Sequence, residues 1–220
     1  MEKYNFFKTP NQLIDSATEG LIGNKGSSLV VGLIYFLSKA CFLAGLTTLI
    51  VGLTQLRGAT NNYSLIFWGI GLLILALFSF GPLKVSFCKN ALNMINNTSP
   101  KAKDVWFGFK NKYFRNVWFG ICLFVSYLFH ILLIVFPFFI KYFSYQVAGF
   151  ILAEDNGISA IGALKLSSKM TKGFRKTYFK IILKFIPQML LCLITLYIYS
   201  LWLRPKFNTV VGCYYQDIKE

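Results

Sequence analysis

Residues 64–83 read SLIFWGIGLLILALFSFGPL, and this stretch contains no charged side chain. A helix that crosses a membrane needs about 20 mostly apolar residues, so one such helix fits the stretch. Five further apolar segments lie on either side of it, at residues 27–53, 117–136, 138–153, 179–199 and 201–215. The sequence therefore predicts an all-α membrane protein with six transmembrane helices.

Composition supports this class of protein. Hydrophobic residues make up 55% of the 220 residues and charged residues only 14%, whereas a soluble domain carries roughly 25% charged residues. The 23 Lys and Arg far outnumber the 8 Asp and Glu. In a membrane protein such an excess collects in cytoplasmic loops and meets anionic lipid headgroups. We therefore expect contact with anionic membrane lipids and no nucleic acid partner.

The basic residues also predict an orientation. They gather between the second and third apolar segments and between the fourth and fifth, whereas the other connections carry few charges. The positive-inside rule then places both termini in the cytoplasm of a multi-pass plasma-membrane protein. The first apolar segment is longer than the roughly 7–15 residues of a signal-peptide core, so we expect it to remain as a span. Residues 1–26 are predicted to be a cytoplasmic amphipathic segment and residues 27–220 a single membrane domain.

A short motif recurs in the two basic connections. GFKNKYFR begins at Gly108 and GFRKTYFK at Gly173, and both fit G-F-[KR]-x-x-Y-F-[KR] ahead of an apolar segment. A fainter copy, GLIGNKGSS, begins at Gly20. These repeats favour three units, each a cytoplasmic amphipathic helix followed by a transmembrane hairpin.

The clearest amphipathic helix is predicted near residues 157–176. Lys165, Lys169, Lys172 and Lys176 follow helical spacing, so they form one stripe, and Asp155 or Asn156 could cap the helix. The stripe is either a solvated, topology-setting face or a surface that docks anionic lipid or a partner protein.

Several elements together resemble a known family. They are GPL at Gly81, FPFFIKYFSY from Phe136, AEDN from Ala153, SSKMTKGF from Ser167 and WLRPKFNTVVGCYY from Trp202. This set is similar to the bacterial membrane proteins catalogued as domain of unknown function 975. The chain departs from the family pattern at Phe138 and Gly157, where the family has Gly and Pro. The resemblance implies a multi-pass plasma-membrane protein, mostly of Gram-positive bacteria, and no known reaction.

Residues typical of catalysis are sparse. The chain has one His, its five Cys form no CxxC pair, and no phosphate-binding glycine loop occurs. We therefore expect no enzyme activity, no cofactor and no metal site. The unusual residues are cations inside predicted spans, each of which costs about 2.5–3.5 kcal/mol to insert. They are Lys39, His130, Lys141, Arg204 and Lys206.

Two explanations of these cations stay open at this point. They could line a pocket for an anionic ligand, such as a lipid headgroup or a peptide carboxylate, or they could snorkel from span ends toward headgroups. The first explanation predicts a non-enzymatic protein that binds anionic lipid or a membrane-active peptide in envelope homeostasis or self-protection. The alternatives are a transporter or export component, and a structural subunit of a membrane complex that packs through span glycines such as Gly45, Gly69 and Gly81.

Overall fold

The structure, a computed structural model, describes residues 8–22, 24–57, 63–96, 98, 102–132, 141–195 and 198–219. All regular elements in these ranges are helices, so the all-α part of the prediction is confirmed. The elements are α1 (Pro10–Ile22), α2 (Lys25–Arg57), α3 (Ser64–Ile95), η1 (Ala102–Trp106), α4 (Phe107–Lys110), α5 (Tyr113–Leu132), α7 (Ala148–Glu154), α8 (Ala160–Met170), α9 (Arg175–Ile194) and α10 (Ser200–Lys219).

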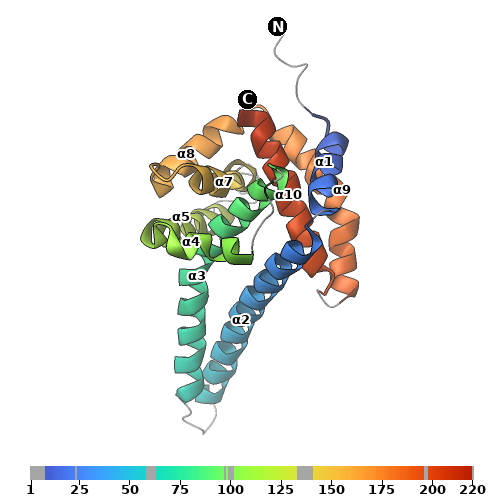
Figure 1. The fold of residues 1–220 in the computed structure, drawn as a ribbon. Coiled ribbons are helices and arrows are strands. Elements are labelled where there is room, and N and C mark those ends of the chain that lie inside the picture. The colour runs from blue at the N-terminus through green and yellow to red at the C-terminus, as the bar shows by residue number, and fades with distance from the viewer. Residues whose placement is uncertain are drawn as a thin grey trace.

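Two long helices project from one end of a helical body and converge at their far ends (Figure 1). We name Lys39–Arg57 of α2 together with Ser64–Lys84 of α3 the hairpin, and the other described residues the body. Glycine lets the two helices pack closely, because a methyl group at Gly45, Gly52 or Gly69 would come within 3.0 Å of the partner helix. These three glycines therefore pack inside the chain and are not an open surface for another subunit.

Both hairpin helices are long and apolar enough to cross a membrane. Among the described residues two helices meet this criterion, Gly26–Gln55 and Ser64–Ile95, and only 17% and 11% of their apolar windows are buried. The core helix of a soluble protein would be mostly buried, so these helices indicate a membrane location. They coincide with the predicted spans 27–53 and 64–83, whereas the six-span arrangement as a whole stays a prediction.

The hairpin is joined to the body by a buried polar junction. Gly81 of α3 crosses α5 so closely that a methyl group on it would lie 1.9 Å from the Asn116 carbonyl oxygen. The fully buried Asn116 side chain donates to the carbonyls of Gly108 and Asn111 at 2.7 Å. The Ser86 hydroxyl accepts from the Gly108 N–H at 2.8 Å. These bonds satisfy buried polar groups and fix α3, α4 and α5 relative to one another.

The core of the body surrounds α10. Two aromatic pairs join this helix to α9, with ring centroids 5.5 Å apart for Tyr178 and Tyr214 and 5.3 Å apart for Phe185 and Phe207. α1 closes the core on another side through Leu13, which is fully buried. The two ends of the described chain meet there, because the Lys8 N–H donates to the Asp217 carboxylate at 3.3 Å.

The fourth predicted span, 138–153, is not one continuous helix in the structure. Residues 133–140 lie outside the described residues, 141–145 are helical, and a turn at Gln146 and Val147 precedes α7. The turn redirects the chain so that α7 packs on α3, where a methyl group on Gly149 would lie 2.7 Å from the Cys88 sulfur. A straight helix would lose this contact, so tertiary packing overrides the apolar run.

The remaining predicted spans correspond to helices with shifted ends. α5 covers residues 117–132, the described part of the predicted span 117–136, and α9 covers 179–194 but gives way to a turn at Thr195. α10 extends 201–215 to Lys219. Both copies of the recurring motif lie where a short helix meets a longer one, since α5 begins within the first copy and α9 within the second.

The lysine stripe is interrupted. Gly173 has φ +100°, a left-handed conformation that glycine adopts readily, and it ends α8 in a turn. Lys165 and Lys169 therefore lie on α8, Lys172 in the turn and Lys176 on α9, although all four side chains are exposed. The prediction of a single helical stripe was wrong for this reason.

The predicted helix cap was also wrong. Asp155 ends α7 and accepts from the Gly157 N–H at 2.6 Å, so it serves a local turn. Ser159 caps α8 instead, with its hydroxyl accepting from the Gly162 N–H at 3.1 Å. The amphipathic character of α8 is nevertheless present, because Ala160, Ala163 and Ser167 are buried.

Candidate functional site

The predicted intramembrane cations fall in several places. Lys39 is exposed on α2, and Arg204 is partly buried near the start of α10. Lys141 lies 5.7 Å above the ring of Tyr145, one turn along its own segment. Lys206 is partly buried two residues after Arg204, and residues at that spacing on a helix do not share a face. His130 belongs to α5, but its side chain lies outside the described residues.

Lys39 and Arg204 meet at one aromatic ring. The Lys39 ammonium lies 5.7 Å from the centroid of the Tyr35 ring, and the Arg204 guanidinium carbon lies 4.7 Å from it. Both distances fit a cation held over an aromatic face, which is worth about 0.5–2 kcal/mol. The tyrosine therefore gathers positive charge from two helices that are far apart in the sequence.

A third cation joins them from α3. Lys84 is partly buried and near enough to Lys39 for their like charges to interact. Phe87, three residues further along α3, packs against Tyr35 with centroids 6.0 Å apart. We name Lys39, Lys84 and Arg204 with Tyr35 the basic cluster. It lies at the base of the hairpin, where the hairpin joins the body.

Helical spacing explains how each element supplies its part. Tyr35 and Lys39 are four residues apart on α2, and Lys84 and Phe87 are three apart on α3, so each pair shares a face. α10 approaches α2 closely because a glycine lies at the crossing: a methyl group on Gly32 would be 2.0 Å from the Leu201 carbonyl oxygen. That approach brings Arg204 to Tyr35.

A second basic grouping holds the AEDN loop. The Arg115 guanidinium donates to the carbonyl oxygens of Leu152, Asp155 and Asn156 at 2.9–3.0 Å. Burial lowers the pKa of Arg115, and the opposing effect of the Asp155 charge is smaller. The side chain nevertheless stays protonated, because arginine does not lose its proton in proteins. All of these acceptors belong to the chain itself, so this arginine positions the end of α7 and offers little to an external ligand.

The loop is also tied to α10. Glu154 accepts from the Tyr215 hydroxyl at 2.7 Å and forms an ion pair with Lys219 at 2.5 Å. Exposed ion pairs contribute about 0–1 kcal/mol, so the tyrosine bond is the stronger part of this link. These contacts hold α7 against α10, so the acidic residue of the AEDN segment has a structural role.

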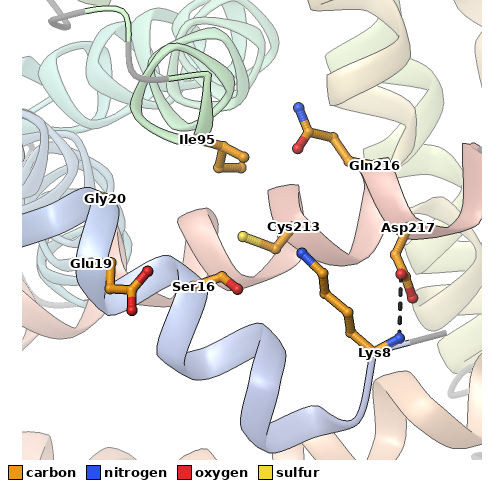
Figure 2. Close-up of a pocket in the computed structure, with 8 residues that line it drawn as sticks. All are labelled: Lys8, Ser16, Glu19, Gly20, Ile95, Cys213, Gln216 and Asp217. Atoms are coloured by element: carbon orange, nitrogen blue, oxygen red, sulfur yellow. Dashed lines mark hydrogen bonds between the residues drawn. The ribbon is translucent and has the colours of Figure 1, made fainter. Parts of the chain in front are cut away.

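A cavity of about 380 Å³ lies among α1, the end of α3 and α10 (Figure 2). Figure 2 shows Lys8, Glu19, Cys213 and Asp217 around it. Several of its polar groups have partners within the chain: the Lys8 backbone N–H donates to Asp217, the Ser16 hydroxyl donates to the Gln12 carbonyl, and the Gln216 amide donates to Asn96. In the described part of the chain no group of three His, Cys, Asp or Glu side chains could hold a metal ion. We therefore take the basic cluster, and not this cavity, as the candidate ligand-binding site.

Comparison with known families bears on the C-terminal half. Residues 115–220 match the family described as "Protein of unknown function (DUF975)". This segment is therefore similar to DUF975 proteins. The match confirms the resemblance seen in the sequence, although it covers just under half of the chain and leaves the GPL segment at Gly81 outside. No curated protein and no solved structure matches the chain.

The DUF975 segment begins at Arg115, which donates hydrogen bonds to the AEDN loop, and it extends through α10. It contains Arg204 of the basic cluster, whereas Tyr35, Lys39 and Lys84 precede it. Sequence reasoning found Lys39 and Arg204 but assigned Lys84 to a cytoplasmic loop and overlooked Tyr35. The missed signal is position: Lys84 directly follows the charge-free stretch 64–83, so in a hairpin it returns to the level of Lys39.

Proposed function

We propose that this chain is a non-enzymatic, multi-pass protein of the bacterial plasma membrane that binds anionic lipid on the cytoplasmic side. The observation that carries the proposal is the hairpin: an exposed, charge-free pair of helices whose base holds three converging cations. Exposed apolar side chains on it include Leu43, Ile50, Phe67 and Ile74. Water would make this surface costly, by about 25 cal/mol for each Å² of apolar area, whereas hydrocarbon would not.

The distribution of charge supports the orientation. The hairpin carries no charged residue between Lys39 and Arg57 or between Ser64 and Leu83. Exposed lysines lie instead on the body, among them Lys165, Lys169 and Lys176. The positive-inside rule then assigns the body and both termini to the cytoplasm. The other four predicted spans lie within the body, so the proposal keeps residues 27–53 and 64–83 as its two membrane crossings. The exposed apolar faces of α5 and α9 are consistent with further contact with lipid.

The lower end of the body supports contact with the membrane surface. The end of α9 and the start of α10 lie at the end of the body from which the hairpin projects (Figure 1). At these two helix ends Ile194, Ile198 and Trp202 are 78%, 61% and 50% exposed. Tryptophan is enriched where membrane meets water, so this end fits against the headgroup region.

Reconstitution tests the proposal. The purified protein is placed in a bilayer containing equal amounts of phosphatidylglycerol and phosphatidylcholine with matched acyl chains, then released gently for native mass spectrometry. The expected result is protein that carries phosphatidylglycerol in clear excess. Protein that emerges bare, or that carries both lipids equally, would contradict anionic lipid binding. Protein that stays in solution without detergent or lipid would contradict the membrane location itself.

A further inference from the structure

The basic cluster lies one hydrocarbon thickness from the tip of the hairpin. Lys39 precedes Arg57 by about 18 residues and Lys84 follows Ser64 by about 20, which at about 1.5 Å per residue correspond to about 27 and 30 Å. The hydrocarbon core of a bilayer is about 30 Å thick. Two helices thus independently place their lysines at the same level, where the headgroups of one leaflet begin.

An exposed apolar stripe leads from the cluster toward the tip. Leu43, Leu46 and Ile50 follow Lys39 at helical spacing and are 60%, 38% and 51% exposed. On α3, Phe80 lies one turn below Lys84 and is 36% exposed. A molecule with an anionic group at the cluster would therefore extend apolar chains along the hairpin.

We infer that the basic cluster binds the phosphate group of an anionic phospholipid in the leaflet adjoining the body, with the acyl chains along the Leu43–Ile50 stripe. This inference rests on the proposed function and adds the site, the leaflet and the recognised group. Arg204 suits a phosphate because its planar guanidinium forms two parallel hydrogen bonds to phosphate oxygens. Lys39 and Lys84 add two compact charges, and binding an anion relieves their mutual repulsion.

The apolar stripe also decides between two sources of the phosphate group. Free inorganic phosphate would gain only the charge contacts, and it would leave water to reach a site at the edge of hydrocarbon. A phospholipid already resides at this level and gains contact along the stripe. The lipid headgroup is therefore the occupant, and inorganic phosphate is the competitor that tests the choice.

Two triple variants of the full chain separate the site from bulk charge. The first is Lys39→Gln, Lys84→Gln and Arg204→Gln, and the control is Lys165→Gln, Lys169→Gln and Lys172→Gln, which removes the same charge from exposed positions of the body. Both are compared with the unmodified protein for retention of phosphatidylglycerol and phosphatidylcholine by native mass spectrometry, with and without inorganic phosphate. Circular dichroism on heating checks that each variant is folded.

The expected result is that the unmodified protein and the control retain phosphatidylglycerol, while the cluster variant loses about tenfold or more of its affinity, the effect of one lost charge-assisted bond. Inorganic phosphate should not displace the lipid. Equal retention by the two variants, or displacement by inorganic phosphate, would overturn the inference while leaving anionic lipid binding intact. Failure of the unmodified protein to prefer phosphatidylglycerol would overturn both. If the cluster variant unfolds, Arg204→Lys serves instead, and unchanged affinity there would count against bidentate binding.

Discussion

The hairpin and the body are built from similarly apolar helices but bury them differently. In the body, Phe185 on α9 is 1% exposed and packs edge-on against Phe207. In the hairpin, Phe67 and Ile74 on α3 are 75% and 52% exposed and face away from the chain. The comparison teaches that apolar composition alone does not say what covers a helix. The body is covered by its own side chains, and the hairpin requires lipid.

α3 shows both conditions within one helix. Its first half, up to Phe80, is exposed or half-buried apart from Gly69, whereas most residues from Gly81 through Met94 are buried. The change falls at Pro82 to Lys84, and Lys84 belongs to the basic cluster. The cluster therefore marks the border between the lipid-covered and the self-covered part of the molecule.

The largest expected effect is the loss of a core ring in the body. Phe185→Ala removes the contact with Phe207 and should lower the free energy of unfolding by about 3–5 kcal/mol. The neighbouring variant Ile186→Ala alters a side chain that is 42% exposed and should cost much less. Thermal unfolding in the same detergent compares the two, and equal losses would mean that α9 is not packed by the Phe185 face.

A charge placed in the hairpin should matter almost as much. Ile74→Lys puts an ammonium halfway along the charge-free part of α3, at an expected cost of about 2.5–3.5 kcal/mol for insertion. Ile161→Lys, at a position on α8 that is 48% exposed, should change stability by about 0.5 kcal/mol or less. The measurement is the fraction of each variant in the membrane pellet after expression. The comparison of the two regions breaks down if Ile161→Lys is the more disruptive change.

The junction between the two regions gives a further contrast. Gly81→Ala would place a methyl group 1.9 Å from the Asn116 carbonyl oxygen and should destabilise the protein by about 1–3 kcal/mol through overpacking. Gly71→Ala meets nothing within 4 Å and should stabilise α3 by up to about 1 kcal/mol through helix propensity. Opposite shifts in melting temperature are expected, and two shifts of the same sign would contradict the assigned crossing of α3 and α5.

The smallest effect concerns the surface of the body. Ser159→Ala removes the cap of α8 and should cost about 1 kcal/mol, whereas Ser159→Asp should preserve the cap. Hydrogen exchange of the Gly162 amide is the direct measurement. Unchanged protection in Ser159→Ala would show that Asp155 or Asn156 caps the helix after all.

The parts of the fold that local sequence determines were predicted well. Residues 64–83 predicted a helix because charge-free apolar runs of that length have few alternative structures, and α3 begins at Ser64 as expected. The turn at Gly173 and the break at Gln146 were not predicted, because each depends on where the following helix packs. The continuation of α3 past Leu83 was missed for the same reason: Val85 and Phe87 are buried by the body, whose position the run does not encode.

Some members of the basic cluster could likewise be predicted from the sequence, and others could not. Lys39 and Arg204 stood out because a cation within an apolar segment is costly. That they share Tyr35 could not be predicted, because the crossing of α2 and α10 depends on the approach of Gly32 to Leu201. The position of Lys84 could have been predicted, since its distance from the hairpin turn can be counted along the sequence.

The most direct test of the account is a depth measurement on the hairpin. Nitroxide spin labels are attached at Ile74→Cys and Leu37→Cys, which are 52% and 56% exposed, in a variant whose native cysteines are replaced. Accessibility to oxygen and to a water-soluble nickel chelate is measured in phosphatidylglycerol bilayers. The account predicts that the Ile74 label lies near the bilayer centre, with high oxygen accessibility, and the Leu37 label at the headgroups, where the nickel chelate reaches it. Equal depths, or free access of the chelate to both labels, would contradict a hairpin that crosses the hydrocarbon with the basic cluster at its edge.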